Sequence, residues 1–304
     1  MAFSLNDGLF ILYWVYIPPL NFLYALQVYV ICKHKHLHNS SFYRLFVVGA
    51  VNDVFMQIGN MFYRIEVTPY ISPWFENVHD GIGIRLFFVM TYYFGTAQEV
   101  FNVSVALNRM TSIVVYANHE RIWRHLIPLV AIAMLTLPMS YCWMILSCNY
   151  PSFLPSNVTG EIVYMASVDC SMFPDFNRNS VFLVIEVVSP CVSIVIYTFT
   201  TVFMRVRGLK IATVERRLFY YGMLLVLLNI PMAVLEMLLA FFRTPLVSFY
   251  GITQIPWVLD LKIFAPPILL YLFNAEIRRR VWSLIEGNKK KKPKRKTSVT
   301  MTVV

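Results

Sequence analysis

The stretch SVFLVIEVVSPCVSIVIYTFTTVFM, residues 180–204, contains one charged side chain, Glu186, among 25 residues. A helix needs about 20 predominantly apolar residues to cross ~30 Å of hydrocarbon. A bilayer core holds no water to pair with backbone N–H and C=O groups, so a spanning segment of this kind has to be a helix. We therefore predict that residues 180–204 form a transmembrane helix.

Six further apolar blocks of similar length lie along the chain. They cover residues 9–32, 43–65, 82–108, 126–147, 217–242 and 253–273. Of the 304 residues, 58% are hydrophobic and 14% are charged, whereas a soluble domain carries about 25% charged residues. We predict an all-α membrane protein whose residues 9–273 form a seven-transmembrane helix bundle. No Lys or Arg precedes the first block, so we expect a retained span there instead of a cleaved signal peptide.

The Lys and Arg residues lie mostly on one side of the predicted spans. Of the 26, 21 fall on the side of the loop between the first two spans, two lie within spans, and Arg64, Arg178 and Arg243 fall on the opposite side. Cytoplasmic loops carry an excess of Lys and Arg, so we expect residues 1–8 to be extracellular and the chain to lie in the plasma membrane. The net charge of +10 follows from this bias and does not indicate a nucleic-acid partner.

The segment between the fourth and fifth predicted spans would then be extracellular. It contains the glycosylation sequon Asn157-Val158-Thr159, which predicts a glycan on Asn157. It also contains Cys148 and Cys170. An oxidising compartment permits a disulfide between these two cysteines, although the sequence leaves their pairing open.

Two short motifs lie at the end of the third predicted span and just beyond it: LNRMTS at residues 107–112 and HERIW at residues 119–123. TVERRL at residues 213–218 enters the sixth span, and Asp260 precedes APPILL at residues 265–270 in the seventh. This set, in this order, resembles the nematode serpentine receptors of class gamma, with the sister class V as a close alternative. The resemblance implies a chemosensory G-protein-coupled receptor of sensory neurons, with a small-molecule or peptide ligand and a heterotrimeric G protein as partners.

Ionisable residues inside spans are costly in lipid and usually face the interior of a bundle. Arg85, Tyr92 and Glu99 are seven residues apart, and two steps of seven drift by only ~40° on a helix, which predicts one shared face. We expect a ligand site in the outer half of the bundle, lined by Arg85, Tyr92, Glu99, Glu186, Trp257, Asp260 and Lys262. A structural ion pair between Glu99 and Lys262 is the alternative, and the two interpretations are compatible.

Arg109 stands where rhodopsin-like receptors have the arginine of their Asp/Glu-Arg-Tyr motif, but here Asn108 replaces the acid. An arginine in that place can hold a closed state, and Glu215 at the start of the sixth span is a candidate partner. An arginine that snorkels to the membrane surface is the alternative. Asp53 lies near mid-membrane, where a carboxylate of rhodopsin-like receptors joins a polar cluster that often binds sodium; a packing hydrogen bond with Asn102 or Asn108 is the alternative.

Prolines lie within the last two predicted spans. Pro231 and Pro267 each remove a helix hydrogen bond and are expected to bend their helices, which would provide hinges for the inner face. Pro267 and Tyr271 only approximate the Asn-Pro-x-x-Tyr pattern of rhodopsin-like receptors. We group these three residues as candidates for activation and G-protein coupling with Asp53, Asn108, Arg109 and Glu215.

Two segments follow the seventh span. In residues 274–287, apolar residues recur at helical spacing beside three arginines, which predicts a short amphipathic helix on the inner leaflet. Residues 288–304 form a basic tail in which seven of the eight residues 289–296 are Lys or Arg. Such a run attracts anionic inner-leaflet lipids, and a solvated tail is the alternative. The last residues, Thr302-Val303-Val304, fit a PDZ ligand.

Other classes of function fit the sequence less well. It contains no metal-ligand cluster, nucleophile elbow or phosphate loop that would indicate an enzyme or a cofactor. Lys262 and Glu99 are placed like the Schiff-base lysine and counter-ion of a retinal-binding photoreceptor, but a proline follows Lys262 sooner than in opsins. A seven-span transporter or channel would often show paired repeats with interrupted helices, and the sequence shows none.

Overall fold

The structure is a computed structural model of the chain. It describes residues 5–68, 82–147, 153–157, 162–166, 178–208, 213–242 and 245–286. Cys148, Cys170 and the tail at residues 288–304 lie outside these ranges. The disulfide, the lipid-binding tail and the PDZ motif therefore stay predictions.

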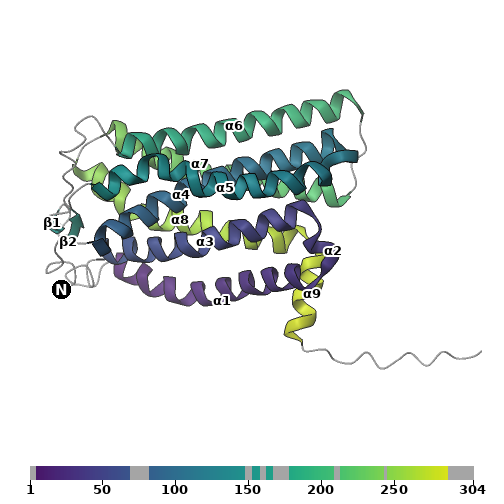
Figure 1. Ribbon diagram of the computed structural model, residues 1–304. Coiled ribbons are helices and arrows are strands. Elements are labelled where there is room, and N and C mark those ends of the chain that lie inside the picture. Colours follow the sequence, from purple (N-terminus) through teal and green to yellow (C-terminus); the bar gives the residue numbers. More distant parts are fainter. Residues whose placement is uncertain are drawn as a thin grey trace, which may run out of the picture.

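Seven long helices run side by side as a bundle in the part of the chain that the structure describes (Figure 1). They are α1 (Leu5–Lys33), α3 (Ser41–Glu66), α4 (Ile82–Val114), α5 (His119–Ser147), α6 (Arg178–Val206), α7 (Thr213–Phe241) and α8 (Pro245–Phe273). Each of the seven predicted spans falls on one of these helices, and only residue 242 extends past its helix, α7. The predicted seven-helix bundle is confirmed.

Six of these helices, α1, α3, α5, α6, α7 and α8, are long and apolar enough to cross a membrane. The exception is α4, which carries buried Gln98, Glu99 and Asn102. This helix packs against α3, α5, α6 and α7, so protein surrounds its polar side chains. A helix at the centre of a bundle does not need the uniformly apolar surface of a lipid-facing one. The chain is a multi-pass membrane protein.

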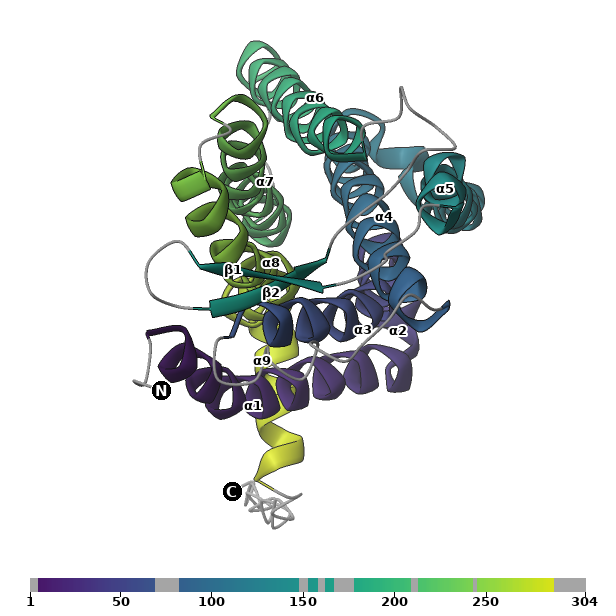
Figure 2. The same ribbon diagram turned by 90° about the vertical axis from the view of Figure 1, so that its left-hand side faces the viewer.

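The shorter elements lie at the two ends of the bundle (Figure 1). At one end, strands β1 (Phe153–Asn157) and β2 (Ile162–Ala166) pair antiparallel. Viewed along the bundle, the strands lie in front of α8 and α3 (Figure 2), and β2 contacts α3. We call this the hairpin end. Apart from this hairpin, the described residues are helical, as predicted. The hairpin itself was not predicted, because Pro155 within β1 weakens a strand signal in the sequence.

The opposite end, which we call the α9 end, carries α2 (Lys35–His38), η2 (Tyr116–Asn118) and α9 (Ala275–Ile285). The helix α9 lies within the predicted amphipathic segment 274–287. Asn274 caps it by accepting from two backbone N–H groups at 3.1 Å, and Ile277 and Val281 are buried where α9 meets α1 and α8. The predicted amphipathic helix is therefore present at this end.

A small polar cluster ties α9 to α2. The Glu276 carboxylate lies 2.7 Å from His36 Nε2 and accepts from Arg280 Nη2 at 2.8 Å. Burial raises the pKa of the Glu276 carboxyl, but the hydrogen bonds from Arg280 and His36 outweigh burial, so its pKa lies below the ordinary value. The carboxylate is thus held in the charged form that both neighbours favour.

Candidate functional site

Buried charged side chains gather in three places within the described residues. We call the first the lysine cluster (Glu99, Glu186 and Lys262), and the second the arginine cluster (Tyr13, Tyr16, Asn60, Arg64, Trp257 and Asp260). The third, at the α9 end, is the inner network (Ser41, Asn108, Arg109, Thr111, Ser112, His119, Glu120, Trp123 and Glu215). Each is held by side chains from three or four helices.

The lysine cluster joins α4, α6 and α8. Lys262 Nζ lies 2.6 Å from Glu99 Oε1, and 2.8 and 2.9 Å from the two oxygens of Glu186. The three side chains are at most 2% exposed. The ion pair between Glu99 and Lys262 that the sequence offered as an alternative is therefore present, and Glu186 adds a second carboxylate.

In the lysine cluster, two carboxyl groups surround one ammonium group. Charges removed from water are stable only when they are paired and hydrogen-bonded. Lys262 makes all three of the contacts that hold the carboxylates. Among the described residues, Lys262 therefore links α4, α6 and α8 through side-chain hydrogen bonds.

The arginine cluster joins α1, α3 and α8 around Asp260. The Asp260 carboxylate accepts from the Tyr16 hydroxyl, from Asn60 Nδ2 at 2.7 Å and from Arg64 Nη2 at 2.5 Å. The backbone carbonyl of Pro256, one turn earlier on α8, accepts from the same asparagine at 3.0 Å and the same arginine at 3.1 Å. Two residues of α3 thus bind one turn of α8.

The charge count placed Arg64 on the outer side without predicting that it is buried. The residue lies in α3, is 1% exposed and forms an ion pair with Asp260. Its guanidinium carbon lies 4.3 Å from the ring centre of Tyr13 and 3.9 Å from that of Trp257. A signal was present in the sequence, since Asn60 and Arg64 are one helical turn apart at the end of an apolar span.

The predicted ligand residues do not all gather at one place. Asp260 and Lys262 are two positions apart on α8, and they face the arginine cluster and the lysine cluster respectively. Arg85 Nη1 donates to the Leu146 carbonyl of α5 at 3.4 Å, and the ring of Tyr92 lies 5.2 Å from that of Phe182. The seven-residue spacing on α4 therefore does not predict which helix each side chain meets.

Asp53 is buried on α3, and its partner differs from the expected ones. The Tyr24 hydroxyl of α1 donates to Asp53 Oδ2 at 2.5 Å. Asn108 donates to Ser41 instead, at 3.1 Å, and Asn102 Nδ2 has no hydrogen-bond partner among the described residues. The packing hydrogen bond predicted for Asp53 is present, but α1 provides it.

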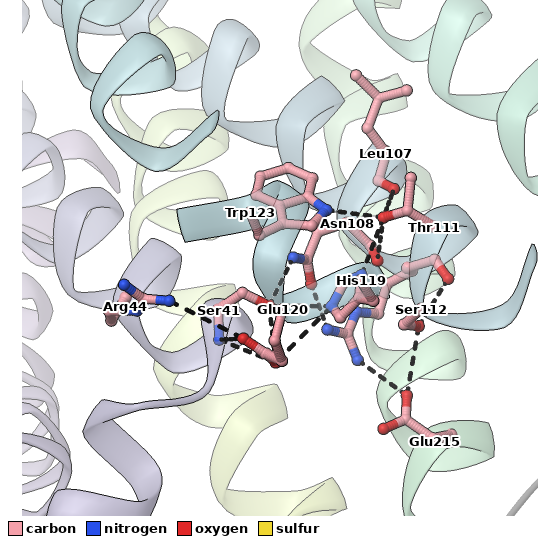
Figure 3. Close-up of polar contacts among 11 residues, drawn as sticks. Ser41, Arg44, Leu107, Asn108, Thr111, Ser112, His119, Glu120, Trp123 and Glu215 are labelled. Carbon is pink, nitrogen blue, oxygen red and sulfur yellow. Dashed lines mark hydrogen bonds and ion pairs between the residues drawn. The ribbon is translucent and has the colours of Figure 1, made fainter. Parts of the chain in front are cut away.

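In the inner network, Arg109 connects α4 to α7. Arg109 Nη1 lies 3.3 Å from Glu215 Oε2. Ser112 Oγ donates to the same oxygen at 3.4 Å (Figure 3). The guanidinium also donates to Asn108 Oδ1 and lies against the ring of Phe42. Arg109 is 3% exposed, so it does not snorkel to the membrane surface, and the predicted contact with Glu215 is present.

The HERIW motif connects the start of α5 to α3 and α4 (Figure 3). Glu120 accepts from the backbone N–H of Ser41 at 3.0 Å and from its hydroxyl at 3.1 Å. His119 Nε2 lies 2.9 Å from the same hydroxyl, and Trp123 Nε1 donates to Thr111 Oγ1 at 2.7 Å. A carboxylate of α5 therefore accepts a hydrogen bond from the first backbone N–H group of α3. Such groups at the start of a helix lack a partner within the helix.

The prolines lie inside continuous helices. Pro231 is within α7, and Pro266 and Pro267 are within α8. The Pro267 carbonyl accepts from Gln27 Nε2 of α1 at 2.8 Å, and the Tyr271 carbonyl accepts from Arg278. The proposed hinge role of Pro231, Pro267 and Tyr271 stays a prediction.

Comparisons with known proteins agree on one family. A family model described as the Srg family chemoreceptor matches residues 10–281. The chain is 24% identical to serpentine receptor class gamma-20 of Caenorhabditis elegans, over 86% of this chain and 77% of that protein. It is 22% identical to class gamma-2 over 92% of this chain and 86% of that protein, and 21% identical to class gamma-10 over 86% and 81%, both from the same organism. The predicted resemblance to class gamma is confirmed.

Proposed function

Because the chain belongs to the Srg family of chemoreceptors, we propose that it binds an extracellular chemical cue and signals to a heterotrimeric G protein. The cue is a small molecule or a peptide, and it binds in the half of the bundle toward the hairpin end. The G protein binds at the α9 end. The plasma membrane of a sensory neuron is the proposed location.

The observation that supports this proposal best is the contact between Arg109 and Glu215. It joins α4 to the first turn of α7 at 3.3 Å, and Ser112 strengthens it from the same helix face. Breaking this contact would free the start of α7 to move outward and open the α9 end. Asn108 stands where the rhodopsin-like motif has an acidic residue. The acidic partner of Arg109 is therefore Glu215 on another helix, α7.

We infer the orientation of the chain in the membrane from the distribution of its Lys and Arg residues. Of the loops and tails, those at the α9 end carry most of the Lys and Arg residues, as cytoplasmic segments do. We propose that Asn157 carries a glycan on the outer side and that Cys148 pairs with Cys170 there. On the inner side, the basic tail binds anionic lipids, and the C-terminus is a ligand for a PDZ protein.

Glu215→Gln tests the proposed coupling without a known ligand. We expect it to raise the basal G-protein signal by roughly two- to fivefold, since a partly exposed ion pair contributes up to about 1 kcal/mol. The measurement is second-messenger output in cells that express the full chain, normalised to surface expression. Glu286→Gln, an exposed carboxylate at the end of α9, is the matched control and should leave the signal unchanged.

Two results would count against coupling. One is the same basal signal in the wild type, both variants and untransfected cells. The other is an increase that persists when the G protein is absent, because the signal would then have another source.

A further inference from the structure

Arg64 has more hydrogen-bond donors than the described residues satisfy. A guanidinium carries five N–H groups. Nη2 donates to Asp260 and to the Pro256 carbonyl, whereas Nε and Nη1 are buried and have no partner among the described residues. Three N–H groups of a side chain that is 1% exposed therefore lack an acceptor within the part of the chain that the structure describes. Buried donors of this kind are rare without a functional reason or an unseen partner.

The charge of Arg64 is already balanced. Asp260 forms the ion pair with it, and Asp260 itself accepts three hydrogen bonds. A second anion would place an uncompensated charge in a buried site. A neutral oxygen would accept from the free N–H groups without adding charge, and hydrogen bonds to a charged donor are the stronger kind.

The side chains around Arg64 are largely aromatic and aliphatic. Tyr13 and Trp257 hold their rings against the guanidinium. Tyr13 belongs to a buried apolar cluster that also contains Ile255, Leu259 and Phe264. Arg64 lies two residues before the end of α3, the helix that β2 contacts at the hairpin end. The free donors are therefore placed in the half of the bundle where we expect the cue.

We propose that Arg64 binds the carbonyl oxygen of a neutral, largely apolar cue, that is, a ketone, an aldehyde, an ester or a lactone. The inference rests on the proposed receptor function and names the chemical class of its ligand. The guanidinium supplies the polar contact, and the aromatic and aliphatic side chains around it contact the hydrocarbon part. This division is usual for small-molecule sites, in which a few polar groups fix orientation within an apolar lining.

The test uses cells that express the full chain with a G-protein readout. The probes are a panel of aliphatic ketones, aldehydes, esters and lactones, with the matched carboxylates, amines and alkanes. We expect responses to the carbonyl compounds alone. Arg64→Lys keeps the positive charge next to Asp260 but removes the planar guanidinium group with its additional N–H donors. We expect this variant to weaken the response by about 10- to 100-fold, which corresponds to the loss of one charge-assisted hydrogen bond.

Two further variants separate ligand binding from folding. Arg124→Lys makes the same exchange at an exposed position of α5, outside the arginine cluster, and should respond like the wild type. Arg64→Gln combined with Asp260→Asn removes both charges together, so that neither is left unpaired, and it should reach the surface and still lose the response. Surface expression is measured for each variant.

Three outcomes would overturn the inference. In the first, carboxylates, amines or alkanes are the active compounds. In the second, Arg64→Lys responds like the wild type, which would mean that water satisfies the free donors. In the third, no probe acts although Glu215→Gln raises the basal signal, which would leave the receptor function standing. No probe response together with no basal signal in any variant would contradict both proposals.

Discussion

At the scale of single residues, Lys262 is the cation that pairs with two buried carboxyl groups. Its removal would leave Glu99 and Glu186 facing each other without a cation. Removing one partner of a buried ion pair typically costs about 3–5 kcal/mol. We therefore expect Lys262→Met to lower the stability of the detergent-solubilised protein by about that much, measured as thermal or denaturant unfolding.

Two further variants test whether the loss of stability comes from the unpaired carboxylates. The triple variant Lys262→Met, Glu99→Gln, Glu186→Gln carries no buried charge in the cluster and should recover most of the lost stability. Lys33→Met, at the exposed end of α1, should have little effect. A triple variant that is no more stable than Lys262→Met would show that packing, and not charge, accounts for the loss.

The sequence predicted that charged residues are buried in these clusters, but it did not predict all of their partners. Asp260 and Lys262 were both expected to line one site, yet they face different helices. Which side of α8 meets which neighbour depends on how the helices cross, and no local pattern records that. Arg64 was missed because it lies at the end of a span, where a charge count treats an arginine as part of a loop.

At the scale of elements, the start of α3 is held by α5. Glu120 accepts from the Ser41 N–H and lies 3.9 Å from Arg44. An anionic acceptor at a helix N-terminus stabilises it, and this carboxylate is half exposed, so the expected contribution is about 0.5–1 kcal/mol. We expect Glu120→Gln to lower unfolding stability by that amount.

Arg121→Gln is the matched control for this prediction, because Arg121 is exposed on the neighbouring position of α5. It should leave the unfolding midpoint unchanged. Equal unfolding midpoints for Glu120→Gln and the wild type would contradict this prediction. They would mean that the hydrogen bond between the Ser41 hydroxyl and His119 is enough to hold the start of α3.

The elements themselves follow closely from the sequence, for a local physical reason. Apolar blocks of membrane length predict helices without knowledge of their neighbours, and α9 is predicted by helical spacing within its own residues. The β1–β2 hairpin was not predicted, because both strands are only five residues long and Pro155 interrupts the first. Contacts between elements, such as Glu120 with Ser41, needed the structure, since these residues are 79 positions apart.

At the scale of the whole molecule, the two ends of the bundle differ in chemistry. The arginine cluster lies toward the hairpin end, where α1 begins and α3 ends (Figures 1 and 2). The inner network lies at the α9 end, where α3 and α7 begin. The lysine cluster joins α4, α6 and α8 between them. In our account, a cue binds at one end and the G protein binds at the other, so the direction of the chain in the membrane is its central claim.

The most direct measurement of this claim is antibody access to tags placed at the two ends of the full chain in animal cells. We predict that a tag before Met1 is stained in intact cells, and that a tag after Val304 is stained only after permeabilisation. The opposite pattern, with the C-terminal tag reached in intact cells, would contradict the account, because the hairpin end would then face the cytoplasm.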